Sequence, residues 1–190
     1  MKSVSALLQY AIRLRTRREN ERAINILSAL RKEYPENPDV AYHYAWTLDH
    51  LGREEDAIPL YQAAIKNKLN HRDMVGCFLG LGSSLRCQKR FKESEKILSH
   101  AIRQHPSHPI LQVFLALTYS ENNRKTMALR ALMDVMLKTS SNAEILSYRK
   151  FFARCFKKRE TPDNYSPDRS ESDYEKKSRD DRLASSPEAI

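Results

Sequence analysis

Small and large apolar residues recur along the chain in a long-period pattern that appears four times. The four units start at Val4, Pro38, Val75 and Pro109. Small residues occupy the eighth position (Ala11, Ala45, Gly82 and Ala116) and the twentieth position (Ala23, Ala57, Ser94 and Ala128), and large residues occupy the twenty-fourth (Leu27, Tyr61, Leu98 and Leu132). Two antiparallel helices approach closely only where both carry small residues, and larger neighbours fill the seams between them. The pattern therefore predicts a stack of helix pairs.

The apolar spacing predicts eight helices in four pairs. They are Ser5–Thr16 with Glu21–Glu33, Val40–Leu51 with Glu54–Lys66, Met74–Cys87 with Phe91–Gln104, and Ile110–Glu121 with Lys125–Lys138. The second and third units are 37 residues apart instead of 34, and we expect the extra residues in a longer turn near Asn67–Asp73. Asn142 is a candidate N-cap for a ninth helix over residues 143–158, whose apolar stripe is suited to cover the last pair.

The repeated residues resemble the tetratricopeptide repeat (TPR) family, and within it the small bacterial-type scaffolds. The 34-residue unit of that family is a helix–turn–helix. The best single match carries Tyr44, Ala45, Leu48, Gly52, Ala57, Tyr61 and Ala64, whereas the turn glycine is replaced by Arg18, Lys89 and Asn123 in the other units. The resemblance implies an all-α, right-handed solenoid over residues 4–159. Its four repeats would span about 4–37, 38–74, 75–108 and 109–142, and a capping helix would follow at 143–158.

Charge and composition change at residue 160. Residues 160–190 are rich in Ser, Asp, Glu, Lys and Pro, and we expect this tail to be disordered because it cannot bury enough apolar surface. The tail holds 5 Lys/Arg and 9 Asp/Glu, a net charge of −4, so the whole-chain charge of +9 leaves +13 on residues 1–159. A basic body favours acidic partners of any kind.

No stretch approaches the ~18 apolar residues of a membrane span, and we expect no membrane partner.

The N-terminus and the cysteines bear on the compartment. Residues 1–18 are basic and free of acidic residues, as in a mitochondrial presequence, but Leu7, Ala11 and Leu14 occupy repeat positions, which favours a structural helix. The three cysteines have no metal-ligand spacing and are odd in number. They are interpreted as reduced thiols, and the chain is therefore predicted to be cytoplasmic.

The resemblance also implies a binding groove, because the first helices of successive TPR repeats line a concave face. Carried over position by position, the predicted groove residues are Leu8, Ile12, Arg15, Tyr42, His43, Trp46, Asp49, His50, Leu79, Ser83, Arg86, Val113, Leu117 and Glu121. Tyr42, His43 and Trp46 form a second stripe on their helix, and large aromatic residues dominate binding hot spots. Two interpretations of Trp46 stay open: a ligand contact, or packing against neighbouring first helices.

Two glycines of the third first-helix have no packing explanation in the sequence. Gly76 and Gly80 lie one turn apart on the predicted groove face, where they would form either a shallow depression or a frayed helix.

One TPR subgroup binds C-terminal carboxylates with a set of Lys, Asn and Arg residues. The matching positions here are Leu8, Ile12, His43, Gly76 and Gly80, so that clamp is not expected.

No motif of catalysis or cofactor binding is present, and we expect neither an enzyme nor a cofactor. His100, His105 and His108 do not have a metal-ligand spacing and are interpreted as solvated turn residues. The predicted function is a non-enzymatic adaptor that binds a peptide or protein segment in the groove, with acidic segments among the expected partners. The alternative is nucleic-acid binding through the basic, aromatic run over residues 149–159.

Overall fold

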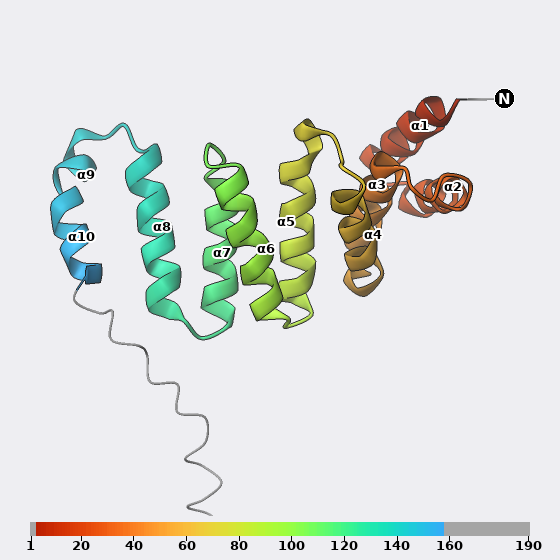
Figure 1. Cartoon of the computed structure of the whole chain (residues 1–190). Helices are drawn as coiled ribbons and strands as arrows, with labels where there is room; N and C mark the ends of the chain where they lie inside the picture. The colour runs from red at the N-terminus through yellow and green to blue at the C-terminus, as the bar shows by residue number, and fades with distance from the viewer. Residues whose placement is uncertain (1–2, 158–190) are drawn as a thin grey trace, which may run out of the picture. The chain divides into compact units, whose positions relative to one another are not determined.

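The computed structural model describes residues 3–157, which form ten α-helices and no β-strand (Figure 1). The helices are α1 (Val4–Thr16), α2 (Asn20–Glu33), α3 (Pro38–Asp49), α4 (Glu54–Lys66), α5 (His71–Cys87), α6 (Phe91–Gln104), α7 (Ile110–Glu121), α8 (Lys125–Thr139), α9 (Ala143–Ser147) and α10 (Arg149–Lys157). The chain divides into two compact units, Met1–Leu146 and Ser147–Ile190. Among the described helices, none has both the length and the apolar composition that crossing a membrane requires.

The first unit is a two-layered stack of helix pairs. The first helix of each pair packs against its own second helix, and that second helix packs against the first helix of the next pair. The first helices also contact one another in sequence, α1 with α3, α3 with α5 and α5 with α7. These four helices therefore form a continuous layer, called the first-helix layer below, and α2, α4, α6 and α8 form the other.

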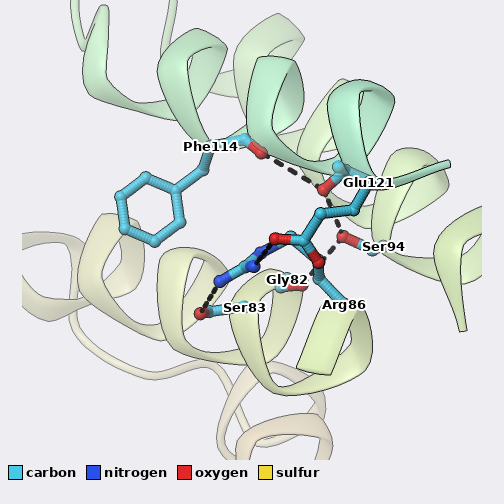
Figure 2. Close-up of polar contacts among 7 residues, drawn as sticks. Gly82, Ser83, Arg86, Ser94, Phe114 and Glu121 are labelled. Atoms are coloured by element: carbon cyan, nitrogen blue, oxygen red, sulfur yellow. Dashed lines mark hydrogen bonds and ion pairs between the residues drawn. The ribbon is translucent and has the colours of Figure 1, made fainter. Parts of the chain in front are cut away.

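The small residues lie where the sequence places them, at the contacts within the helix pairs. The alanines at the eighth and twentieth positions are between 0% and 7% exposed. In the third pair the two positions hold Gly82 and Ser94, and the Ser94 hydroxyl donates a hydrogen bond to the Gly82 carbonyl oxygen at 2.8 Å (Figure 2). A Cβ atom on Gly82 would lie 2.7 Å from the side chain of Leu98. The predicted close approach of paired helices is therefore confirmed.

Each turn within a pair adopts the same backbone conformation, with or without glycine. Gly52 has φ 71°, and the corresponding residues Arg18, Lys89 and Asn123 have φ 63°, 56° and 59°. In the third pair the Arg90 N–H then donates to the carbonyl oxygen five residues earlier, at 2.8 Å, and the other turns repeat this bond. This is the hydrogen bond of a Schellman motif, which satisfies carbonyl groups at a helix C-terminus.

The connection between the second and third pairs differs from the prediction. The three extra residues extend the helix instead of the turn, because α5 begins at His71 and not at Met74. The Asn70 side chain accepts a hydrogen bond from the Asp73 N–H at 3.0 Å and caps this longer helix. The expected long turn near Asn67–Asp73 is therefore wrong.

The C-terminal helix also differs from the prediction. Asn142 is an N-cap as expected, since its side chain accepts hydrogen bonds from the N–H groups of Glu144 at 2.9 Å and Ile145 at 3.2 Å. The single helix expected over residues 143–158 is instead two helices, α9 and α10, separated at Tyr148. Nothing in the local sequence explains the interruption. The capping role stays a prediction, and the tail at 160–190 lies outside the described residues.

Replacing Lys89 with glycine should stabilise the protein. A left-handed conformation costs a non-glycine residue about 1–2 kcal/mol, part of which glycine's larger chain entropy offsets. We expect Lys89→Gly to raise the free energy of unfolding by roughly 0.5–1 kcal/mol, measured by urea denaturation. Lys89→Ala, which removes the same charge but keeps the Cβ atom, is the matched control and should not stabilise. Equal stability of the two variants would contradict the strain argument.

Candidate binding groove

The predicted groove residues differ widely in exposure. Leu8 and Tyr42 are buried, at 8% and 5% exposed, whereas Leu117 is 42% exposed. His50 and Glu121 are exposed. The half-buried residues are Ile12, Arg15, His43, Trp46, Asp49, Leu79, Ser83, Arg86 and Val113. The contacts among the predicted groove residues fall into two groups, one around Trp46 and one around Arg86.

Trp46 is the centre of an aromatic platform on α3, made by Tyr42, His43, Trp46 and His50. Its ring stacks on Tyr42 and His43, with centroid distances of 5.7 and 6.2 Å, and His50 meets it edge-on at 5.9 Å. The guanidinium carbon of Arg15 on α1 lies 3.7 Å from the ring centroid, which is cation–π geometry. Trp46 is therefore packed against the neighbouring first helix and is still half-buried.

The charge beside the platform comes from Arg15. Its Nη1 lies 3.4 Å from His43 Nδ1 and donates to the His43 carbonyl oxygen, also at 3.4 Å. Burial, and then the nearby Arg15 charge, lower the pKa of His43 to about 4. The imidazole is therefore neutral at neutral pH, and an unprotonated Nδ1 can accept a hydrogen bond from the guanidinium. Burial also lowers the pKa of Arg15, which has an ordinary value of 12.5.

A polar cavity of about 520 Å³ adjoins the platform, at the N-terminal ends of α1, α3 and α5. Its lining includes Leu8 and His43, together with Asp39, Asn70 and Asp73. The Asn70 amide donates to Asp39 Oδ1 at 2.7 Å and to Asp73 Oδ2 at 3.0 Å. The predicted groove set omitted Asn70 and Asp73. The capping pair Asn70 and Asp73 was visible in the sequence only as an N-cap followed by a first-turn acid.

Gly76 and Gly80 form neither a depression nor a frayed helix, because tyrosine side chains occupy the space beside them. A Cβ atom on Gly76 would lie 2.5 Å from the Tyr42 hydroxyl oxygen. A Cβ atom on Gly80 would lie 2.8 Å from Tyr61 Cε1 and closer still to Cζ and the hydroxyl oxygen. Both glycines lie inside the continuous helix α5. These two tyrosine–glycine contacts, called the tyrosine joint below, connect the second repeat to the third.

Cys77 is buried at the tyrosine joint. Its side chain is 0% exposed, and Sγ lies 3.6 Å from the Tyr61 carbonyl oxygen. Burial raises the pKa of this thiol to about 12, so it stays protonated at neutral pH. Cys87 and Cys155 are free and exposed.

Asp49 is engaged inside the protein. The Ser84 hydroxyl donates to its Oδ1 at 3.0 Å, and the Tyr61 hydroxyl donates to its Oδ2 at 3.4 Å. Burial raises the pKa of the Asp49 carboxyl above its ordinary value. The carboxylate thus links α3, α4 and α5, and its acceptor capacity toward a ligand is reduced.

The second group of groove residues lies between α5 and α7. Arg86 forms an ion pair with Glu121, and its Nη2 donates to the Ser83 hydroxyl at 3.3 Å (Figure 2). Val113 is half-buried and Leu117 exposed on α7. This end of the first-helix layer therefore combines an internally paired arginine with apolar side chains.

The histidines expected to be solvated turn residues are not equivalent. His105 is only 9% exposed, and its ring meets those of His71 at 5.3 Å and Phe78 at 6.0 Å. Burial, and then the neighbouring histidines, lower its pKa. The prediction is wrong for His105, whereas His100 and His108 are exposed. Within residues 3–157, no cluster of three or more His, Cys, Asp or Glu side chains could hold a metal ion.

A stack of helix pairs with a continuous first-helix layer and an aromatic platform on it defines a helical-repeat protein. The family model described as Tetratrico peptide repeat matches residues 38–143, more than half of the chain. The protein belongs to the tetratricopeptide repeat family. The match covers repeats two to four, and the structure adds the pair α1 and α2 before them. No curated protein sequence matches the chain significantly.

Solved structures share the fold at low sequence identity. MamA from Desulfovibrio magneticus RS-1 (residue 41 to its end) has a TM-score of 0.63 at 16% identity, covering 96% of this chain and 97% of that chain. MamA from strain AMB-1 has a TM-score of 0.64 at 21% identity, covering 71% and 78%. YrrB, described as a TPR protein with an unusual peptide-binding site, has a TM-score of 0.63 at 16% identity, covering 78% and 75%. These likenesses establish an all-α TPR solenoid.

The tyrosine joint predicts a difference between two glycine substitutions. Gly76→Ala and Gly80→Ala should each destabilise the protein, since overpacking costs about 1–3 kcal/mol and better helix propensity returns only part of it. Removing the hydroxyl with Tyr42→Phe should rescue Gly76→Ala, because the hydroxyl oxygen is the only Tyr42 atom within 3 Å of the added Cβ. Tyr61→Phe should not rescue Gly80→Ala, because ring carbons of Tyr61 still overlap it.

The measurement is thermal or urea unfolding of the four single and two double variants. Coupling energies from the two double-mutant cycles give the result directly. Equal rescue in both cycles, or none in either, would contradict the geometry.

Proposed function

We propose that this protein is a non-enzymatic scaffold or adaptor that binds a peptide or protein segment on its first-helix layer. The observation that carries the proposal is the half-buried aromatic platform, where the cation of Arg15 and the rings of Tyr42 and His43 hold Trp46. A large aromatic ring that is already fixed loses little conformational entropy on binding, and such residues dominate interface energetics.

Apolar groups extend the proposed surface along the layer. Leu79 on α5 and Val113 and Leu117 on α7 are half-buried or exposed. An extended segment that crosses α3, α5 and α7 would contact the platform first and these side chains next. The peptide-binding site named for YrrB supports the same use of the fold, on a protein of 16% identity.

The chemistry of the groove supports binding and not catalysis. Ser83 contacts Arg86 and Ser84 contacts Asp49, so neither hydroxyl is paired with a histidine that could activate a nucleophile. His43 is held neutral, and it contacts an arginine. The three cysteines are free thiols, which supports the proposed cytoplasmic location, where thiols stay reduced.

Truncating Trp46 tests the proposal. Peptides of twelve random residues, each with an amidated C-terminus, are selected on the full-length protein, and their affinities are measured by fluorescence anisotropy. We expect Trp46→Ala to weaken the selected peptides by more than ~1 kcal/mol while the circular dichroism stays helical. Phe151→Ala on α10 is the matched control, since this ring is 52% exposed but lies outside the first-helix layer. Failure to select any peptide, or equal affinity for Trp46→Ala and wild type, would contradict the proposal.

A second candidate function is nucleic-acid binding through α10. Tyr148 and Phe151 are 56% and 52% exposed, and Arg149, Lys150 and Arg154 lie in the same short segment. Exposed rings beside cations can stack bases and neutralise phosphates. In that case the logarithm of the affinity for a DNA duplex would fall by roughly 0.9 per phosphate neutralised for each unit of log salt. Phe151→Ala, and not Trp46→Ala, would then weaken binding.

A further inference from the structure

Arg15 differs from the ion-paired arginines of the described chain because it has no acidic partner. The arginines in ion pairs are Arg22, Arg53, Arg86, Arg90 and Arg124, each with an Asp or Glu side chain. Arg15 is half-buried, and its guanidinium contacts the Trp46 ring and His43. A charge that loses water without gaining a counter-charge is not fully compensated.

The unused donors of Arg15 are accessible. A guanidinium has five N–H donors, and the hydrogen bonds of Arg15 within residues 3–157 both involve Nη1, at the long distance of 3.4 Å. Neither Nε nor Nη2 of Arg15 is among the buried polar atoms that lack a partner. These two nitrogens therefore reach solvent and are free to donate to a ligand.

The surroundings of Arg15 do not supply a carboxylate. Asp49 holds the corresponding position on α3, but its oxygens accept from Ser84 and Tyr61. His43 is neutral. Asp39 and Asp73 line the neighbouring cavity, where both accept from Asn70. The electrostatic influence of these two acids reaches His43, but Arg15 has no ion pair with either.

We propose that Arg15, whose guanidinium lies over the Trp46 ring, is the anchor for an Asp or Glu side chain of the bound segment. This inference rests on the proposed peptide binding and adds the chemistry of the partner. The planar guanidinium presents parallel N–H groups that match a carboxylate, and its contact with the indole restricts how the group can turn. Arg15 is not one of the positions at which one TPR subgroup binds terminal carboxylates, which here are Leu8, Ile12, His43, Gly76 and Gly80.

The net charge supports an acidic segment. Residues 1–159 carry +13, so a segment rich in Asp or Glu would be attracted to this part of the protein as a whole before it docks. The platform would then contact an apolar neighbour of the anchoring acid, since Trp46 is only half-buried.

The test is a double-mutant cycle between protein and peptide. The probes are the selected C-terminally amidated 12-residue peptides. Each peptide is made in two versions, one with the selected Asp or Glu and one with Asn or Gln at that position. They are titrated against full-length wild type, Arg15→Gln and Arg13→Gln. Arg13 is an exposed residue on the same last turn of α1, so its variant loses the same charge without touching Trp46.

We expect one acidic position whose amide replacement weakens binding about 10- to 100-fold in wild type and in Arg13→Gln, the range expected for a lost charge-assisted hydrogen bond. In Arg15→Gln the same replacement should change affinity less than about 2-fold, because the partner charge is already gone. Arg15→Lys keeps the charge but not the fork and should show an intermediate loss. If Arg15→Gln does not fold, the Arg15→Lys and wild-type comparison decides.

A second readout reports on position instead of affinity. A carboxylate bound to Arg15 would favour protonated His43, so the NMR-measured pKa of His43 should rise with the acidic peptide and not with its amide twin. Amide replacement that costs the same in wild type and Arg15→Gln, with Trp46→Ala still weakening binding, would overturn the anchor and leave the proposed function intact. Absence of any peptide bound through Trp46 would overturn both.

Discussion

The structure depends on how closely two helices of a pair approach each other. Alanine, glycine or serine occupies the contact between the two helices of every pair. This contact fixes the distance between the two helix axes, and that distance determines the space that the larger side chains fill. Leu27, Tyr61 and Leu98 are each 1% exposed under a following repeat, whereas Leu132 on α8, the last helix of the four pairs, is 43% exposed. The spacing of the pairs in turn brings the first helices into contact, and the aromatic platform depends on that layer.

Most of this architecture could be predicted from the sequence, because small residues at fixed intervals reflect a steric requirement for close helix packing. The start of α5 could not be predicted. Three additional residues between two repeats lengthen either a turn or a helix, and only the capping geometry of Asn70 decides between them. The role of Gly76 and Gly80 could not be predicted from the sequence either. Their partners, Tyr42 and Tyr61, come from different helices, and no periodicity along the chain relates a glycine to the ring that fills its place.

The groove was predictable as a face but not as a set of charges. Register assigns Arg15, Asp49 and Arg86 to the first helices, yet it does not state which of them are satisfied within the protein. Asp49 accepts two internal hydrogen bonds and Arg86 pairs with Glu121, whereas Arg15 turns onto the Trp46 ring. Such choices depend on side-chain rotamers and competing partners at distances of a few ångströms, which a linear pattern does not encode.

The tyrosine joint makes the contact between repeats two and three different from the other contacts between neighbouring repeats. A solenoid unfolds by separating neighbours, and the weakest contact between repeats sets where opening starts. Tyr42 and Tyr61 are seated against α5 at Gly76 and Gly80, so repeats two and three can separate only if both rings leave these positions. The other repeats are joined differently, repeats one and two by Arg15 over the Trp46 ring and repeats three and four by the Arg86–Glu121 ion pair. Cys77 lies beside these rings, fully buried and with its thiol protonated, so a thiol reagent reaches it only when the centre of the protein opens.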